Sequence, residues 1–196
     1  TEYTLHDAHS WTVTHTVKKE EKTYNGMKKN AELKLSYNPV WQSAALRDAV
    51  VTDPEGVEKK IGREEWNVMD AAWVGGAPRY PAEKTLVASL PGVDVGSVIE
   101  YTTVETHSNQ PFFSAYQSFN GFDPVVEKKV AIKAPSGLAL EIAEELKDAV
   151  TAAKDDEDGS VTYEWSAADM PSVKREDDLP PWWSFNAYVL ASAGSW

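Results

Sequence analysis

The sequence of 196 residues contains no cysteine. This absence excludes disulfide bonds, thiolate metal ligands and catalysis by a cysteine nucleophile within the chain. It does not determine the compartment, because many extracytoplasmic bacterial proteins also lack disulfides. A chain of this length can bury a substantial core, so we expect one large domain or at most two small ones, without covalent cross-links.

Basic residues are scarce relative to acidic ones. The 19 Lys and Arg stand against 31 Asp and Glu, which gives a net charge of -12. Phosphate backbones and anionic membrane surfaces are bound by clustered Lys and Arg, and here each lysine pair is isolated among acids. The composition therefore predicts neither a nucleic-acid partner nor binding to an anionic membrane surface.

Long apolar runs are also missing. No segment approaches the roughly 18 apolar residues that a membrane-spanning helix needs. The first residues, Thr1 to Leu5, lack the basic and then apolar pattern of a secretion signal. Either a signal was removed or none existed.

Motifs for catalysis and nucleotide binding are absent as well. The sequence has no Gly-x-Ser-x-Gly elbow, and Gly75-Gly76 lacks the lysine and hydroxyl residue that would complete a phosphate loop. The histidines have no supporting motif for a nucleophile and base pair. They are His6, His9, His15 and His107. We therefore expect this chain not to be an enzyme.

The sequence offers two partial metal motifs, and it favours neither as a site. His9 and His15 would lie roughly 20 Å apart on one strand, too far for one zinc ion. The acidic run from Asp155 to Gly159 resembles part of a calcium loop, but Lys154 stands where the first ligand belongs. The sequence therefore predicts no metal and no cofactor.

Alternation with period two recurs along the chain, as half-buried strands require. Gly, Pro, Asn and Asp clusters separate the alternating segments and predict turns between them. The alternating segments are 11–17, 33–37, 130–132 and 161–165, and the predicted turns are Asn25-Gly26, 53–56, Gly75-Gly76, Pro91-Gly92, 135–137 and Asp158-Gly159. Short strands with frequent turns predict an all-β fold, an antiparallel β-sandwich that could carry one short helix.

The last thirty residues change character. Pro171, Pro180 and Pro181 interrupt any regular pairing, and Trp182-Trp183-Ser184-Phe185 follows without a clear period. We therefore divide the chain into a sandwich domain over residues 1–175 and a proline- and tryptophan-rich segment over residues 176–196.

Several short motifs together indicate a family. They are the double-glycine turn Leu90-Pro91-Gly92-Val93-Asp94-Val95-Gly96 with the strand Ser97-Val98-Ile99-Glu100-Tyr101, Tyr37-Asn38-Pro39, Asp53-Pro54-Glu55-Gly56, Phe112-Phe113 and Asp123-Pro124-Val125. With them the chain resembles, over nearly its whole length, the bacterial domain of unknown function that precedes transglutaminase-like cysteine-protease domains. The resemblance implies that catalysis belongs to a following domain, so none of its catalytic residues carries over to a position here. It also implies an extracytoplasmic protein, periplasmic or secreted.

One segment supports two interpretations. Leu138, Ile142, Leu146 and Val150 recur at spacing four among good helix formers, which predicts a helix over residues 141–153. The family pattern instead implies a strand near residues 138–142 followed by a hairpin. Both interpretations stay open at this point.

Aromatic residues are the strongest remaining hint of function, with eight Trp, eight Tyr and five Phe. For the cluster Phe112, Phe113, Tyr116, Phe119 and Phe122 we favour the core. For the second cluster, Trp182, Trp183, Phe185 and Tyr188, we favour an interface. Adjacent tryptophans of an extended chain point to opposite sides, so one of Trp182 and Trp183 should face outward.

The sequence thus predicts a non-catalytic accessory domain that docks on the downstream transglutaminase-like domain of the same polypeptide and orients or gates it. The alternative is a carbohydrate-binding module of the sandwich type, with Trp66, Trp73 and Tyr80 around Gly75-Gly76 as the candidate ligand-binding residues. A glycan or a peptide remains open as a further partner.

Overall fold

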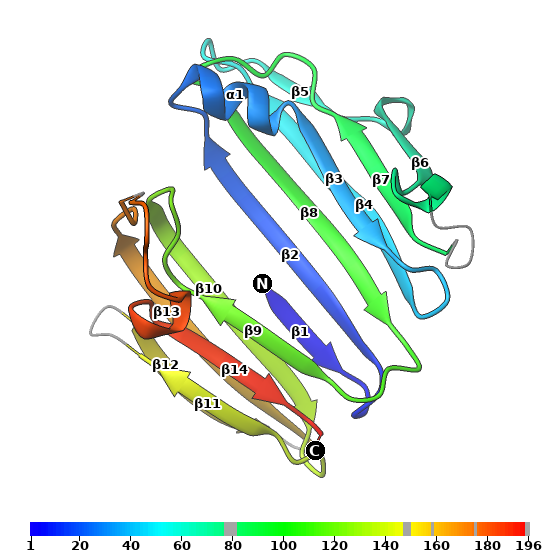
Figure 1. Ribbon diagram of the computed structural model, residues 1–196, viewed down its shortest axis with the longest axis vertical. Coiled ribbons are helices and arrows are strands. Elements are labelled where there is room, and N and C mark those ends of the chain that lie inside the picture. Colours follow the sequence, from blue (N-terminus) through cyan, green and yellow to red (C-terminus); the bar gives the residue numbers. More distant parts are fainter. Residues whose placement is uncertain (77–81, 147–149, 158, 175, 195–196) are drawn as a thin grey trace. The chain divides into compact units, whose positions relative to one another are not determined.

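A computed structural model describes residues 1–76, 82–146, 150–157, 159–174 and 176–194. The chain is all-β, with antiparallel sheets and one short α-helix, as the alternating segments predict. It divides into two compact units. Unit 1 comprises Thr1–Val13 and Ser108–Trp196, and unit 2 comprises Thr14–His107. Strand β2, Trp11–Glu20, contributes to both. Figure 1 shows the order of the elements.

Unit 1 is a sandwich of two sheets. One sheet has the strand order β12-β13-β10-β1 and the other β11-β14-β9. Its elements are β1 (Glu2–Leu5), β9 (Ser114–Ser118), β10 (Val125–Pro135), β11 (Glu141–Glu145), β12 (Val150–Glu157), β13 (Ser160–Met170), the 3-10 turn η3 (Trp182–Ser184) and β14 (Tyr188–Ser192). The pairs within these sheets are antiparallel except that β1 runs parallel to β10, with Glu2 opposite Ala131.

The core of unit 1 is built by alternate residues of both sheets. On β10, Val130, Ile132 and Ala134 are buried, while Lys129 before them and Lys133 between the last two are exposed. Aromatic side chains fill the space between the sheets, because Phe113 packs edge to face on both Tyr3 and Trp11. The predicted period-two alternation is confirmed here, and it places the sandwich core between the two sheets.

Unit 2 contains three of the five family motifs, and the other two, Phe112-Phe113 and Asp123-Pro124-Val125, lie in unit 1. In one sheet of unit 2 β4 pairs with β8 and β5, and in the other β7 pairs with β3 and β6. Its elements are α1 (Tyr24–Asn30), β3 (Glu32–Tyr37), β4 (Gln42–Thr52), β5 (Glu58–Lys60), η1 (Arg63–Glu65), β6 (Trp66–Asp70), η2 (Val74–Gly76), β7 (Lys84–Ser89) and β8 (Val98–His107). Val51, Leu90 and Ile99 form a buried cluster.

The two-glycine turn before β8 meets another family motif in space. Gly92 and Gly96 both have positive φ, 90° and 96°, a conformation that favours glycine. A Cβ on Gly96 would lie 3.4 Å from the ring of Pro54, which belongs to the turn between β4 and β5. The glycines therefore allow two turns of unit 2 to approach closely.

One predicted turn is wrong. Asn25-Gly26 lies within α1 and not in a hairpin turn, because Thr23 caps the helix: its Oγ1 accepts a 3.0 Å hydrogen bond from the Gly26 N–H. Of the two interpretations left open for residues 141–153, the described residues form strands, as the family pattern implies, and not a helix. They include β11 and the first part of β12, since Ile142 packs on the sandwich core, and packing overrides helix propensity. Residues 147–149, and Asp158 of the predicted Asp158-Gly159 turn, lie outside the described residues.

The boundary expected between residues 175 and 176 stays a prediction. Within the predicted terminal segment, Tyr188–Ser192 is the middle strand of the sheet β11-β14-β9. Val189 and Ala191 of this strand are buried in the sandwich core. The aromatic residues just before it are thereby fixed to one sheet of unit 1.

Among the residues that the structure describes, no helix is long and apolar enough to cross a membrane.

Candidate functional site

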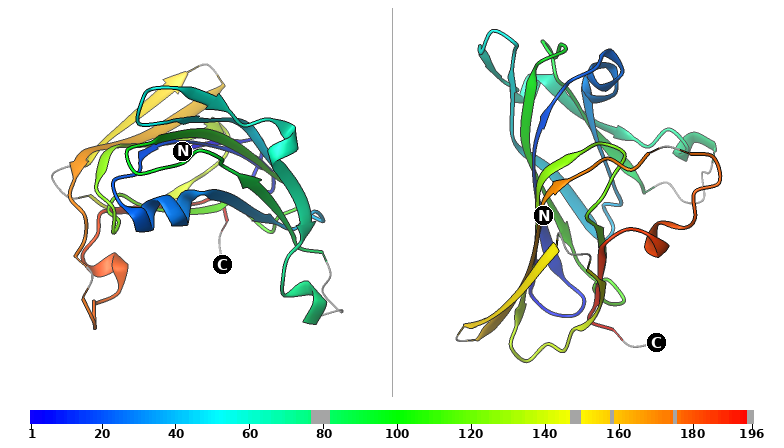
Figure 2. Two further views of the ribbon diagram at one scale, coloured as in Figure 1. Left: turned by 90° about the horizontal axis from the view of Figure 1, so that it is seen from above. Right: turned by 90° about the vertical axis from the view of Figure 1, so that its left-hand side faces the viewer.

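The 3-10 turn η3 presents the two adjacent tryptophans in different environments. It is closed by hydrogen bonds from the Asn186 N–H to the Trp182 carbonyl, 3.0 Å, and from the Ser184 hydroxyl to the Pro181 carbonyl, 2.7 Å. Trp182 is half-buried, whereas the side chain of Trp183 is 65% exposed. Both views of Figure 2 show this turn, in orange-red, standing away from the strands of unit 1.

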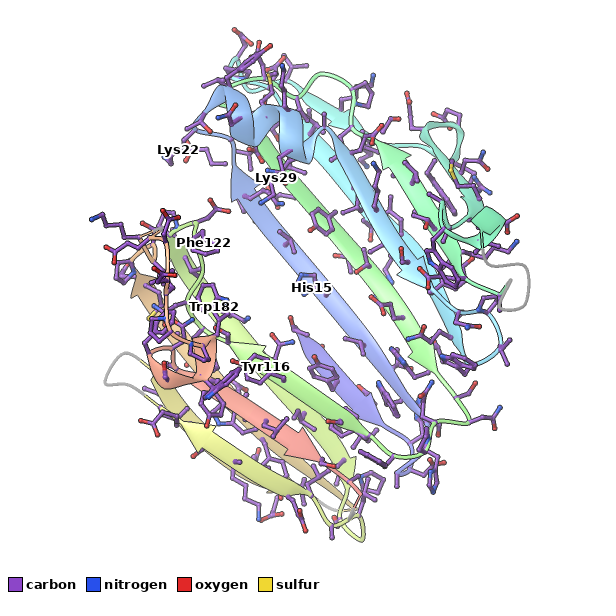
Figure 3. All side chains as sticks on the ribbon, viewed as in Figure 1. His15, Lys22, Lys29, Tyr116, Phe122 and Trp182 are labelled. Atoms are coloured by element: carbon purple, nitrogen blue, oxygen red, sulfur yellow. The ribbon has the colours of Figure 1, made fainter. Side chains whose placement is uncertain are left out.

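Trp182 is held by two other rings. Its indole lies 5.1 Å from the ring of Phe122, centroid to centroid and edge on, and 5.3 Å from the ring of Phe185. Figure 3 shows Trp182 and Phe122 on neighbouring segments of unit 1. Phe122 is itself 38% exposed. The cluster is therefore packed enough to be ordered and open enough to meet a partner.

A second aromatic contact involves Tyr188, which lies three residues after Phe185. The ring of Tyr188, on β14, stacks on the ring of Tyr116, on β9, with the centroids 5.7 Å apart. Leu190 is the register partner of Tyr116, and the two side chains share the outer face of this sheet. Leu190 and Tyr116 are both exposed. Apolar groups thus continue from η3 onto the outer face of β9 and β14.

We call this set the aromatic surface. It consists of Tyr116, Phe122, Trp182, Trp183, Phe185, Tyr188 and Leu190. All four residues expected at an interface are in it. Tyr116 and Phe122, which sequence reasoning assigned to the core, belong to it as well, so that assignment is wrong for these two. Phe113 and Phe119 of the same cluster are fully buried, as expected.

Acidic residues flank the aromatic surface along the chain. Glu176, Asp177 and Asp178 precede the turn and are exposed, and Lys174 forms an ion pair with Glu176 at 3.2 Å. Asp178 has a positive φ of 63°, which turns the chain shortly before Pro180 and Pro181. A partner with basic residues at its rim would match this charge.

A lysine bonded to the end of β9 has a perturbed pKa. Burial lowers the pKa of Lys128 from its ordinary value. Its Nζ donates a 2.6 Å hydrogen bond to the Ser118 carbonyl at the end of β9 and lies 5.8 Å from the centroid of the Phe119 ring. Lys128 therefore has a structural role. It donates a hydrogen bond to a carbonyl of the edge strand β9 that no neighbouring strand pairs with.

The residues proposed for ligand binding lie in unit 2. Trp66 begins β6, and Trp73, which is 47% exposed, follows the end of that strand. The guanidinium of Arg63 lies 3.7 Å from the centroid of the Trp66 ring and so covers one of its faces. Trp66 is the first residue of β6, and Trp73 lies three residues beyond its last, Asp70. Tyr80 lies outside the described residues.

Three of the four histidines make polar contacts of a structural kind. His9 Nδ1 lies 2.9 Å from the Gln110 carbonyl oxygen, and His107 Nδ1 lies 3.2 Å from the side-chain amide of Gln42. His6 Nε2 lies 3.3 Å from the hydroxyl of Thr12. These contacts tie loops and strand ends together.

Comparison with known proteins gives one structural and one family match. No curated protein matches the sequence. The fold is similar to a crystal structure of a "putative protease" from Parabacteroides distasonis ATCC 8503, with a TM-score of 0.88 and 21% sequence identity. The match covers 98% of this chain but 39% of that one, so this chain spans about two fifths of that protein's length.

The family match covers most of the sequence. Residues 7–174 match a family described as a domain of unknown function with a solved structure, DUF3857. This span includes the two-glycine turn and the other motifs that indicated a family from the sequence. The chain belongs to the DUF3857 family of domains of unknown function.

Proposed function

We propose that this chain is a non-catalytic accessory domain that docks, through the aromatic surface, on a transglutaminase-like catalytic domain following it in the same polypeptide. The observation that carries the proposal is Trp183, a large apolar side chain 65% exposed on an ordered turn. Exposed aromatic anchors beside half-buried ones are typical of protein interfaces, where a few Trp and Tyr residues supply most of the binding energy. Docking would orient the catalytic domain or gate its cleft.

The size of the matched protein supports a role within a longer chain. This sequence spans 39% of the similar protein from Parabacteroides distasonis, which leaves room there for further domains. The resemblance to domains that precede transglutaminase-like cysteine proteases supplies the class of the partner. It also supplies the extracytoplasmic location that we propose, periplasmic or secreted.

The chemistry of the chain supports a non-catalytic role. A transglutaminase-like reaction needs a cysteine nucleophile, and the chain has none. His6, His9 and His107 contact a threonine hydroxyl, a backbone carbonyl and an amide respectively. Catalysis is therefore assigned to the proposed partner domain.

The chemistry of the aromatic surface constrains the partner's face. A stacked tyrosine pair, a tryptophan turn and Leu190 require a largely apolar counterpart. The exposed acids Glu176 to Asp178 favour Lys or Arg at its rim, because complementary charge steers association. Salt should therefore slow association more than it weakens the bound state.

Hydrogen exchange of the native full-length polypeptide, compared with this chain alone, tests the proposal. Docking predicts slower amide exchange over residues 181–192 in the full-length protein, while β4 and β8 exchange equally in both. Equal exchange over residues 181–192 in the two proteins would contradict docking at this surface.

A further inference from the structure

An open pocket of about 380 Å³ lies in unit 1, where β11 faces the paired strands β12 and β13. Its volume is in the range of small-molecule sites. Two strands of one sheet supply most of the lining and the third strand comes from the opposite sheet. The lining residues are Ile142, Glu144, Ala152, Ala153, Lys154, Tyr163 and Trp165.

The sequence of β12 explains why space remains there. Ala152 is the register partner of Trp165, and Lys154 is the register partner of Tyr163, so these four side chains share the inner face of the sheet. Alanine is too small to fill the volume beside the indole. The ammonium of Lys154 reaches to 3.6 Å from the Asp156 carboxylate, at the exposed rim. Small and outward-reaching side chains thus leave the ring of Tyr163 half-buried at this pocket, whereas the neighbouring Trp165 is buried.

The aromatic rings and the rim of the pocket are both ordered. The rings of Tyr163 and Trp165 lie nearly parallel, 13° apart in plane with centroids 6.4 Å apart. The Trp165 indole Nε1 donates a 2.6 Å hydrogen bond to Oε2 of Glu144, which fixes that carboxylate at the pocket's edge on β11. Lys154 Nζ lies 5.5 Å from the centroid of the Tyr163 ring. The pocket therefore has a charged acceptor, the Glu144 carboxylate on β11, and a charged donor, the Lys154 ammonium on β12.

We propose that this pocket binds a neutral saccharide. Sugar rings present C–H groups that pack on aromatic rings such as Tyr163, and their hydroxyls both donate and accept hydrogen bonds. The Glu144 carboxylate can accept hydrogen bonds from sugar hydroxyls, and the Lys154 ammonium can donate hydrogen bonds to them. A ligand with a net charge of either sign would meet a like charge in the pocket, which disfavours it. This site is distinct from the aromatic surface and does not rest on the docking proposal.

Saturation-transfer NMR and calorimetry on the whole chain test the proposal. The probes are methyl glucoside, methyl galactoside and N-acetylglucosamine, with glucuronate as the charged comparison. We expect saturable binding of at least one neutral probe and weaker binding of glucuronate. The variant Ala152→Leu, which fills the space beside Trp165, should lower the affinity for the neutral probe by about tenfold or more. The control Ala168→Leu, at an exposed position of β13 outside the pocket, should leave it unchanged.

Two further variants keep the test decisive. If Ala152→Leu impairs folding, Lys154→Met replaces it, since Lys154 is exposed, and a loss of at least threefold in affinity is expected. Glu144→Gln keeps an acceptor for Trp165 but removes the negative charge, so glucuronate should bind this variant more tightly than the wild type. Absence of binding by all three neutral probes, or binding that Ala152→Leu and Lys154→Met both leave unchanged, would overturn the proposal.

Discussion

The indole Nε1 of Trp165 donates a 2.6 Å hydrogen bond to the Oε2 of Glu144, which joins the two sheets of unit 1 at one edge of the sandwich. Trp165 is buried, with 2% of its surface exposed. Replacing Glu144 by alanine removes the only acceptor that the described residues give this buried donor. We expect the free energy of unfolding to fall by about 1 to 2 kcal/mol, measured by urea denaturation.

Glu144→Gln is the matched control, because its amide oxygen can accept the same hydrogen bond. It should lose less stability than Glu144→Ala. Equal losses in the two variants would show that the bond does not contribute as argued.

Gly26 of α1 lies so close to the buried carboxylate of Glu21 that a side chain at this position would collide with it. Glu21 is 3% exposed, and a Cβ on Gly26 would lie 2.6 Å from its Oε2. Alanine normally favours a helix over glycine by about 1 kcal/mol, but here overpacking of a buried side chain outweighs that gain. We expect Gly26→Ala to lower the melting temperature. Gly75→Ala, at a position where a Cβ meets nothing within 4 Å, should change it little.

Tyr101 should make unit 2 less stable at alkaline pH. Desolvation raises the pKa of its phenol above the ordinary value of 10.0. The unfolded chain therefore releases this proton first as the pH rises, and stability is lost above about pH 10. Tyr101→Phe lacks the titrating group, so the wild type should lose stability relative to this variant between about pH 9 and pH 11 in chemical denaturation. A difference independent of pH would contradict the shift.

Two aromatic residues of unit 1 should respond very differently to truncation. Phe113 is fully buried and packs on Tyr3 and Trp11, so Phe113→Ala should cost about 3 to 5 kcal/mol. Trp183→Ala should cost no more than about 0.5 kcal/mol, because most of that side chain is already in water. Denaturation of both variants checks this, and a large loss for Trp183→Ala would place the indole in the core.

The strands were predictable where one face of the strand is buried and the other is exposed to solvent. Val130 and Ile132 flank Ala131, and this alternation predicted β10. Helix α1 was not predicted, because its seven residues bury no side chain and carry no apolar period. For residues 141–153 the sequence left helix and strand open, because a spacing of four fits a helix and also alternate positions of a strand, and tertiary packing decides for the strands.

The candidate site was predictable in part. The prolines before Trp182 indicated an irregular segment, and one of the two tryptophans faces outward as expected, although the backbone there is a 3-10 turn. Tyr116 was missed, yet its alternation with the buried Phe113, Ala115 and Phe119 could have placed it on the outer face. The Glu144 to Trp165 bond carries no local signal, since it joins strands of different sheets.

Binding of this chain to the separately expressed transglutaminase-like domain that we propose as its partner, measured by calorimetry, tests the central claim most directly. The account predicts saturable binding that weakens at least tenfold for Trp183→Ala. Trp73→Ala, which removes a similarly exposed tryptophan from unit 2, serves as the matched control and should bind like the wild type. No binding, or binding that Trp183→Ala leaves unchanged, would contradict docking through the aromatic surface.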